Sequence, residues 1–149
     1  MATLDIDLVL APVDGSDESQ QAVEYAIAIA EEYGATVHAV YVLGEDVARG
    51  IETGAVDEST VATDTESFTE AIFDRADGTG VPVTTSIAYG FSTKVKTTHP
   101  GSVILDTAEE VDADFLVVPR EPVSGDPGEV LEKAAEYVLL YASQPVLSV

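Results

Sequence analysis

The chain has 149 residues, a length that suits one domain with one full-sized core. Its 28 Asp and Glu residues against 6 Lys and Arg give a formal net charge of -22, which excludes sustained binding to nucleic acid because such binding needs clustered basic side chains. Hydrophobic residues still make up 46% of the chain, which argues against intrinsic disorder. The chain has no cysteine and only 2 histidines, so it offers no disulfide, no thiolate chemistry and no histidine-built metal site.

The first third of the chain predicts a strand, a helix and a second strand. Residues 7–13 are an apolar run typical of a strand buried on both faces, and residues 14–17 supply turn and cap chemistry. A helix from Ser16 follows, and Gly34 closes it. The apolar stripe of this helix comprises Ala22, Val23, Ala26, Ile27 and Ala30. Residues 36–42 form the next strand, and the short connections predict a right-handed crossover between two parallel strands.

The middle of the chain predicts a long helix and a third strand. Residues 57–76 have helical spacing, although their many Thr and Asp residues predict a frayed start. The predicted buried face comprises Val61, Phe68, Ala71, Ile72 and Arg75. Residues 77–80 are a turn, and residues 81–89 read as a strand in which Pro82 indicates a strand start or a sheet edge.

The last third predicts two more helix and strand pairs. A polar stretch over residues 90–102 leads into a helix with Ser102 as its N-cap, followed by a strand over residues 115–118. Pro127 opens the last helix at a first helical position, and the closing strand covers residues 146–149. The chain shows neither a basic leader nor an apolar stretch long enough to span a bilayer, so we expect a cytoplasmic protein without a membrane partner.

Alternation of strands and helices over the whole chain predicts the fold class. It is α/β, a single domain over residues 1–149 with a five-stranded parallel sheet covered by helices on both faces. Acidic residues are scattered over every predicted helix rather than gathered in one tail. At about 1 M salt the Debye length is only ~3 Å and carboxylate repulsion is screened. We therefore interpret the acidity as adaptation to concentrated salt in a halophilic source, the alternative being a cationic partner.

Several motifs resemble the universal stress protein (UspA-like) family in the order that this family has them. The first strand ends in Pro-Val-Asp-Gly-Ser at residues 12–16, and Gly34-Ala35 precedes the second strand. Residues 113–118 are similar to the family's A-D-L-I-V run, and residues 144–149 to its closing P-V-L-V-V strand, whereas the likeness is weakest between residues 44 and 101. The resemblance implies the strand order 3-2-1-4-5 and a ligand crevice between the first and fourth strands.

The resemblance also implies a set of nucleotide-binding positions. They are Pro12, Asp14, Val42, Val118, Ser124, Gly125 and Lys133. ATP-binding members carry after the fourth strand a G-x-x-G motif, nine further residues and then G-S or G-T, and such glycines let backbone N–H groups approach the phosphates. An ungapped alignment anchored on Pro145 puts Pro119 and Pro122 at the two glycines and Glu132-Lys133 at the G-S pair.

These departures argue against ATP binding. Proline has no N–H to donate and its ring fills space that a phosphate needs, while Glu132 adds a negative charge. We therefore predict no cofactor. The alternative is a switch that binds ATP or AMP through Asp14, Val42, Val118 and a rearranged loop at Ser124-Gly125. For Asp14 we favour the structural role of a turn residue that caps backbone N–H groups.

Other polar residues are weaker candidates for a site. His38 reads as a packed or edge histidine, and the loop that carries His99, Lys94 and Lys96 reads as a solvated loop rather than an anion-binding patch. Two carboxylate pairs read as solvated helix ends rather than acid–base pairs: Asp112 with Asp114, and Glu31 with Glu32. The enzyme alternative is a small hydrolase of nucleotides or phosphoesters, but the sequence shows no identifiable nucleophile, base or metal cage for it.

The sequence therefore predicts a homodimeric regulatory or interaction module that is not an enzyme. In the resembling family, dimers commonly form through the last strand. The corresponding interface residues are Val146, Leu147, Ser148 and Val149. An apolar edge strand of this kind tends to be paired, and a further protein partner is an open possibility.

Overall fold

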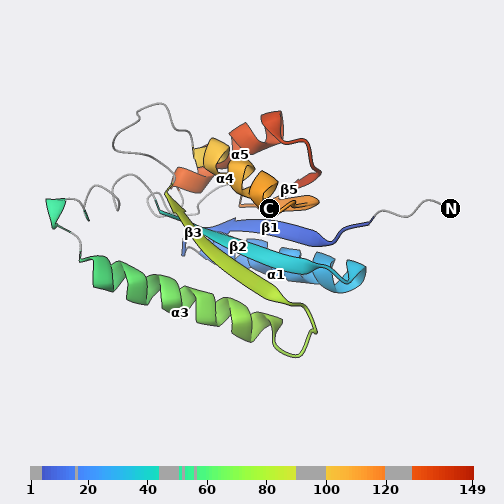
Figure 1. Cartoon of the computed structure of the whole chain (residues 1–149), viewed down its shortest axis with the longest axis horizontal. Helices are drawn as coiled ribbons and strands as arrows, with labels where there is room; N and C mark the ends of the chain where they lie inside the picture. The colour runs from blue at the N-terminus through green and yellow to red at the C-terminus, as the bar shows by residue number, and fades with distance from the viewer. Residues whose placement is uncertain are drawn as a thin grey trace.

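A computed structural model describes residues 5–15, 17–43, 51, 53–55, 57–89, 100–119 and 129–149. The strands and helices alternate along the described chain (Figure 1). In chain order they are β1 (Leu8–Val13), α1 (Asp17–Tyr33), β2 (Thr36–Leu43), α3 (Glu58–Ala76), β3 (Val83–Tyr89), α4 (Pro100–Glu110), β4 (Phe115–Val118), α5 (Glu129–Tyr141) and β5 (Val146–Ser148).

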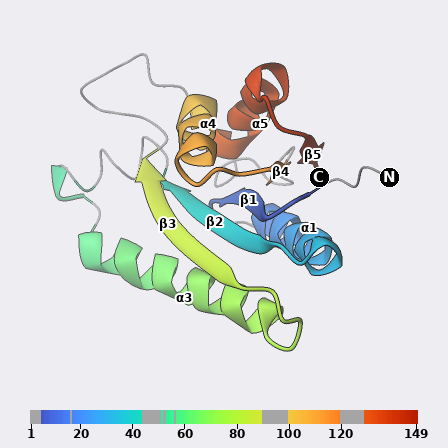
Figure 2. The same cartoon turned by 45° about the vertical axis from the view of Figure 1, so that its right-hand side comes forward.

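The strands form one parallel sheet in the order β3-β2-β1-β4-β5. Helices α1 and α3 cover one face of this sheet, and α4 and α5 cover the other (Figure 2). Both the predicted fold class and the predicted strand order are confirmed. Parallel strands need crossover helices. Right-handed crossovers put α1 and α3 on one face, where the strands are added from β1 to β3, and α4 and α5 on the other, where the direction of addition is reversed.

The core divides into two clusters because alternate side chains of each strand point to opposite faces. The cluster under α1 and α3 contains Val9, Ala11, Val13, Val37, Ala39, Phe68 and Ile72. The cluster under α4 and α5 contains Leu10, Val40, Val42, Ile104, Leu116, Val118 and Val138. The unbroken apolar runs of β1 and β2 follow directly, since a strand buried on both faces needs apolar side chains at every position.

Local hydrogen bonds and backbone conformation explain where α1 ends and where β1 begins. Gly34 takes a φ of 67°, and the Ala35 N–H donates to the Ala30 carbonyl at 2.8 Å, which is the glycine C-cap that the sequence predicts. Asp114 accepts hydrogen bonds from the backbone N–H groups of Asp7 at 2.9 Å and Leu8 at 3.1 Å. Its carboxylate therefore fixes the entry of β1 beside β4.

Helix α3 forms despite its many threonines, and its first described turn is regular. The Asp57 side chain caps the helix by accepting from the Ser59 N–H at 3.0 Å. Thr65 and Thr69 donate their hydroxyls to carbonyls four residues earlier, each at 2.8 Å. These internal hydrogen bonds satisfy side chains that would otherwise compete with the helix, and the Asp57 cap gives the helix a regular first turn where the sequence predicts fraying.

Three other predicted boundaries also need correction. Helix α4 begins at or before Pro100, so Ser102 lies inside it and is not the N-cap; proline is well tolerated in a first helical turn. Strand β3 begins at Val83 rather than two residues earlier, and β5 ends at Ser148. Pro127, the predicted start of the last helix, lies outside the described residues.

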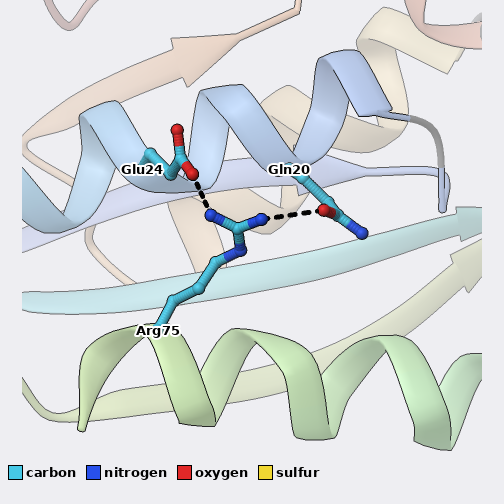
Figure 3. Close-up of polar contacts among 3 residues, drawn as sticks. All are labelled: Gln20, Glu24 and Arg75. Atoms are coloured by element: carbon cyan, nitrogen blue, oxygen red, sulfur yellow. Dashed lines mark hydrogen bonds and ion pairs between the residues drawn. The ribbon is translucent and has the colours of Figure 1, made fainter.

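Arg75 ties α3 to α1 across the outside of the sheet. Its guanidinium forms an ion pair with Glu24 and donates to Gln20 Oε1 at 2.9 Å (Figure 3). Arg75 is half-exposed rather than buried in the helix interface, so the prediction that it belongs to the buried face is only partly right. Its guanidinium contacts the neighbouring helix α1 instead of the core.

Candidate functional site

The candidate site lies where the order of the strands reverses, between β1 and β4. Strand β1 leads into α1 on one face of the sheet, whereas β4 leads toward α5 on the other face. Two connections that leave neighbouring strands in opposite directions open a crevice at the carboxyl ends of these strands. The turn at Asp14 and Gly15 follows β1 at this position, and Pro119 follows β4.

Strand register brings four of the predicted site residues together. In the pairing of β1 with β2, Val13 lies opposite Tyr41, and the same register continued by one residue places Asp14 opposite Val42. In the pairing of β1 with β4, Leu10 lies opposite Leu116, and the same register continued by two residues places Pro12 opposite Val118.

Three of these side chains also share one face of the sheet. Val42 and Val118 belong to the cluster under α4 and α5. Pro12 is an even-numbered position of β1, and strand alternation puts it on the same face as Leu10. Asp14 directly follows the end of β1. The sequence prediction for Pro12, Asp14, Val42 and Val118 is therefore consistent with one crevice.

The other predicted site positions cannot be joined to this set. Ser124 and Gly125 lie outside the described residues. Lys133 lies within α5, at least one turn after Glu129, so its backbone N–H falls among those that hydrogen-bond inside a helix rather than among the free N–H groups of the first turn. Pro119 directly follows β4 and is buried.

The turn at Asp14 and Gly15 is fixed by Tyr41, a residue that sequence reasoning did not single out. The Tyr41 hydroxyl donates to the Asp14 carbonyl at 3.3 Å, and the Asp14 N–H donates to Ser19 Oγ at 3.4 Å. Gly15 has a φ of 87°, and a Cβ atom at this position would lie 2.6 Å from the Tyr41 hydroxyl oxygen. Only glycine satisfies both the backbone conformation and this close approach.

Tyr41 is held from the α1 and α3 face, opposite the crevice. Its ring meets Phe68 edge to face with a centroid distance of 5.8 Å. Burial raises the pKa of Tyr41, and the negative charges of Asp14 and Asp64 raise it further. The phenol therefore stays protonated and keeps its hydrogen to donate to the turn.

The floor of the crevice is apolar with one carboxylate at its rim. Val42 is 2% exposed and Val118 is 1% exposed, whereas Asp14 is half-buried with its Oδ2 atom shielded from solvent. Among the side chains that the structure describes, Arg75 is the one Lys or Arg, and it lies with α1 and α3 on the opposite face. The described part of the crevice therefore has a carboxylate at its rim and supplies no positive side chain for a phosphate.

His38 is a packed histidine, as predicted. It is 8% exposed, its Nδ1 lies 2.6 Å from Thr84 Oγ1 and its Nε2 lies 2.9 Å from Ser86 Oγ. Hydroxyls can donate or accept, so both ring nitrogens of a neutral imidazole are satisfied. Burial lowers the pKa of His38.

Unfolding titrations are expected to show a contribution of His38 to the pH dependence of stability. The unfolded chain binds a proton at the ordinary histidine pKa of about 6.5, while the folded protein binds it only at lower pH. The unfolded state therefore holds more protons in this window, and the free energy of unfolding falls as the pH drops below the unfolded pKa. In His38→Gln the loss between about pH 7 and pH 5.5 should be smaller; an equal slope in both proteins would contradict the assignment.

The rest of the described structure offers no second candidate site. A shallow depression of about 340 Å³ is lined by Val103, Asp106, Thr107, Glu109 and Glu110. It lies on α4, whose carboxyl end faces the amino ends of the strands rather than the crevice. Within the described ranges, His, Asp and Glu nowhere gather in a group of three that could hold a metal ion. The described helices also lack the length and apolar character needed to cross a bilayer.

The fold defines a class of parallel α/β proteins in which the strand order reverses between β1 and β4. Comparison with known proteins gives the family. Residues 6–149 match the model of the universal stress protein family, and a universal stress protein of Methanocaldococcus jannaschii is 31% identical over 144 residues, covering 95% of this chain and 80% of that protein. The chain belongs to the universal stress protein family.

Solved structures share the fold across the whole chain. A universal stress protein in complex with cAMP superposes with a TM-score of 0.67 at 23% identity, covering 98% of both chains. The universal stress protein from Archaeoglobus fulgidus in complex with dAMP gives a TM-score of 0.63 at 22% identity, again covering 98% of both chains. At these identities the likeness concerns the fold.

Proposed function

We propose that this universal stress protein is a homodimeric regulatory or interaction module that works in the cytoplasm without ATP and without catalysis. One observation carries the proposal. Pro119 is buried directly after β4, where the family resemblance implies a glycine whose backbone would approach the triphosphate. A proline there donates no hydrogen bond and occupies the space.

The position of α5 supports the same conclusion. Glu132 and Lys133 would align with the G-S pair, yet both lie inside the helix rather than ahead of its first turn. Helix N-termini bind anions through their free N–H groups and positive dipole end. The Glu132 carboxylate and a Lys133 N–H that is already used inside the helix are a poor replacement for the free N–H groups of the family's G-S pair.

Calorimetric titration with MgATP in about 2 M KCl tests the proposal. We expect no saturable heat corresponding to a dissociation constant below about 10 μM, or roughly 7 kcal/mol. A family member with an intact G-x-x-G motif is the positive control under the same conditions. Tight binding of MgATP would refute the proposal, as would steady release of phosphate that is lost in Asp14→Ala.

A second candidate is a switch that binds an adenine nucleotide with a single phosphate. Two similar structures were solved with cAMP and dAMP, and neither ligand has the triphosphate that the glycine loop would hold. Asp14, Val42 and Val118 share the crevice needed for the nucleoside part. Binding of AMP but not ATP, weakened in Asp14→Ala, would favour this candidate.

The proposed dimer pairs the β5 strands of two copies. Strand β5 is the edge of the sheet, and Val146 to Val149 are half-buried. Helix α5 packs on β5 and exposes large apolar side chains near its end. They are Leu139 at 52%, Leu140 at 70% and Tyr141 at 65% exposure. Exposed apolar side chains beside an edge strand are typical of a surface that a second copy covers.

Sedimentation in about 2 M KCl tests the dimer. Tyr137 packs on Gly101 of α4, so Leu139, about 200° further round the helix, lies on the side of α5 away from α4. Leu139→Glu should give a monomer because it buries a charge in the interface. Tyr33→Glu, a change of a 46% exposed residue at the end of α1, should leave the dimer intact. A monomeric wild-type protein would refute this arrangement.

A further inference from the structure

The outer edge of β3 is a regular and accessible strand edge. Strand β3 ends the sheet order, and it pairs with β2 without interruption from Val83 opposite Val37 to Tyr89 opposite Leu43. Within the described ranges no strand pairs with its other side. Seven residues in unbroken register make a longer edge than the three residues of β5.

Hydrogen bonding to β2 shows which peptide groups face outward. The Val37 N–H donates to the Pro82 carbonyl at 3.0 Å, so even-numbered residues of this segment direct their peptide groups toward β2. In a parallel strand the direction alternates from one residue to the next. Thr85 and Ile87 therefore direct both their N–H and C=O groups toward the open edge.

This edge lacks the features that usually protect an edge strand from pairing. Natural edges carry charged side chains, bulges or prolines within the strand. The sequence has no charged residue between Asp77 and Lys94, although 23% of the whole chain is charged. The register with β2 contains no bulge, and Pro82 precedes the strand rather than interrupting it.

Apolar side chains lie beside the open edge. Helix α3 runs along β3 at this end of the sheet (Figures 1 and 2). Ile87 is 57% exposed, and Phe73 of α3 is 45% exposed. Since Arg75 reaches α1, Phe73, about 200° away on the helix, lies on the side that faces away from α1.

The side chains of an added strand would meet both residues. Val83 packs in the cluster under α1 and α3, and strand alternation puts Ile87 on the same face. A strand paired with the outer edge would therefore place alternate side chains next to Ile87 and toward Phe73. Apolar side chains at these positions would bury surface that is now exposed.

Charge restricts the partner further. Glu66 and Glu70 are exposed on the outer part of α3, and the whole chain carries a charge of -22. A second copy at this edge would bring its own Glu66 and Glu70 near these carboxylates, whereas Lys or Arg would be attracted to them.

We propose that the outer edge of β3 docks an extended segment of a partner protein that has apolar side chains at alternate positions and Lys or Arg at its ends. Strand addition of this kind takes its affinity from main-chain hydrogen bonds and its specificity from the alternate side chains. The proposal deepens the interaction role proposed above, but its test requires neither a nucleotide nor the β5 dimer.

The probe is a fluorescent, end-blocked peptide of about ten residues that alternates valine and threonine and has two lysines at each end. Fluorescence anisotropy is measured in about 0.5 M KCl, where non-specific charge attraction is weak. We expect saturable binding to the wild-type protein. A peptide of the same charge with prolines in place of the central threonines should not bind, because it lacks the donors for strand pairing.

Two variants locate the binding at β3. Thr85→Pro removes an outward N–H without removing a hydrogen bond to β2, and it should weaken binding by about tenfold or more. Ile87→Lys should weaken it by a similar factor because it repels the lysines and removes an apolar contact. The control is Tyr33→Lys, which adds the same charge at an exposed position at the end of α1 and should leave the affinity unchanged. Urea unfolding of each variant verifies that it is folded.

Several outcomes would overturn the proposal. They are an absence of saturable binding, equal binding of the proline-containing peptide, and unchanged affinity in both folded β3 variants. Sedimentation of the protein alone gives the fourth, since a lower mass of Thr85→Pro would mean that a second copy occupies this edge. Binding of ATP or a monomeric state at β5 would refute the proposed function and leave these measurements unaffected.

Discussion

Raising KCl from about 0.1 M to about 2 M is expected to increase the free energy of unfolding of this protein by on the order of 3 kcal/mol. The folded chain gathers a net charge of -22 into one domain, and this repulsion is weaker in the expanded unfolded state. Salt at molar concentration shortens the Debye length to about 3 Å and screens the repulsion. For a chain of this length the gain corresponds to a rise in the unfolding temperature of about 10 °C.

A charge-neutralising variant separates screening from other effects of salt. Helix α1 has no basic residue in its last turn, where the exposed Glu31 and Glu32 face the negative end of the helix dipole. Replacing both by Gln should raise stability in dilute salt by about 1 kcal/mol and reduce the salt dependence. The matched control is Gln21→Ala on the same helix, which should keep the wild-type slope. A stability that is flat or falls with KCl would contradict the screening explanation.

Most of the fold could be predicted because its determinants are local. Strands buried on both faces need continuous apolar runs, and the stretches ending at Val13 and Val42 have them. Helix α1 ends at Gly34 because only a residue that tolerates positive φ closes the helix there. The errors occur where tertiary contacts override propensity. Helix α4 starts before Ser102, and Gly101 within it lies against Tyr137, where a Cβ would approach ring carbon Cδ1 to 2.6 Å.

The candidate site was predicted only in part for a similar reason. Pro12, Asp14, Val42 and Val118 could be grouped because their strands end at one edge of a parallel sheet, and the register agrees. Tyr41 was missed because its hydroxyl reaches the Asp14 turn from the opposite face of the sheet. A signal existed in hindsight. Strand β1 is followed by an Asp-Gly turn, and a tyrosine of β2 lies opposite the last residue of β1. This arrangement places a long polar side chain beside the glycine of the turn.

Replacing Gly15 by Ala is expected to destabilise the protein by about 3 kcal/mol through two separable causes. The first is backbone strain, because a φ of 87° is unfavourable for any residue with a Cβ. The second is a clash, because the new Cβ would lie 2.6 Å from the Tyr41 hydroxyl oxygen. Urea unfolding at constant KCl measures the total.

A double-mutant cycle with Tyr41→Phe separates these causes. Removing the hydroxyl leaves the ring carbon Cζ of residue 41, at 3.6 Å, as the nearest atom to the new Cβ, an ordinary contact distance. The cost of Gly15→Ala should therefore fall by about 1–2 kcal/mol in the Tyr41→Phe background, while the strain remains. Gly34→Ala is the matched control, since its φ of 67° is also positive but nothing lies within 4 Å of its Cβ position. It should cost about 1–2 kcal/mol in both backgrounds. Equal costs of Gly15→Ala with and without the hydroxyl would show that Tyr41 does not hold the turn.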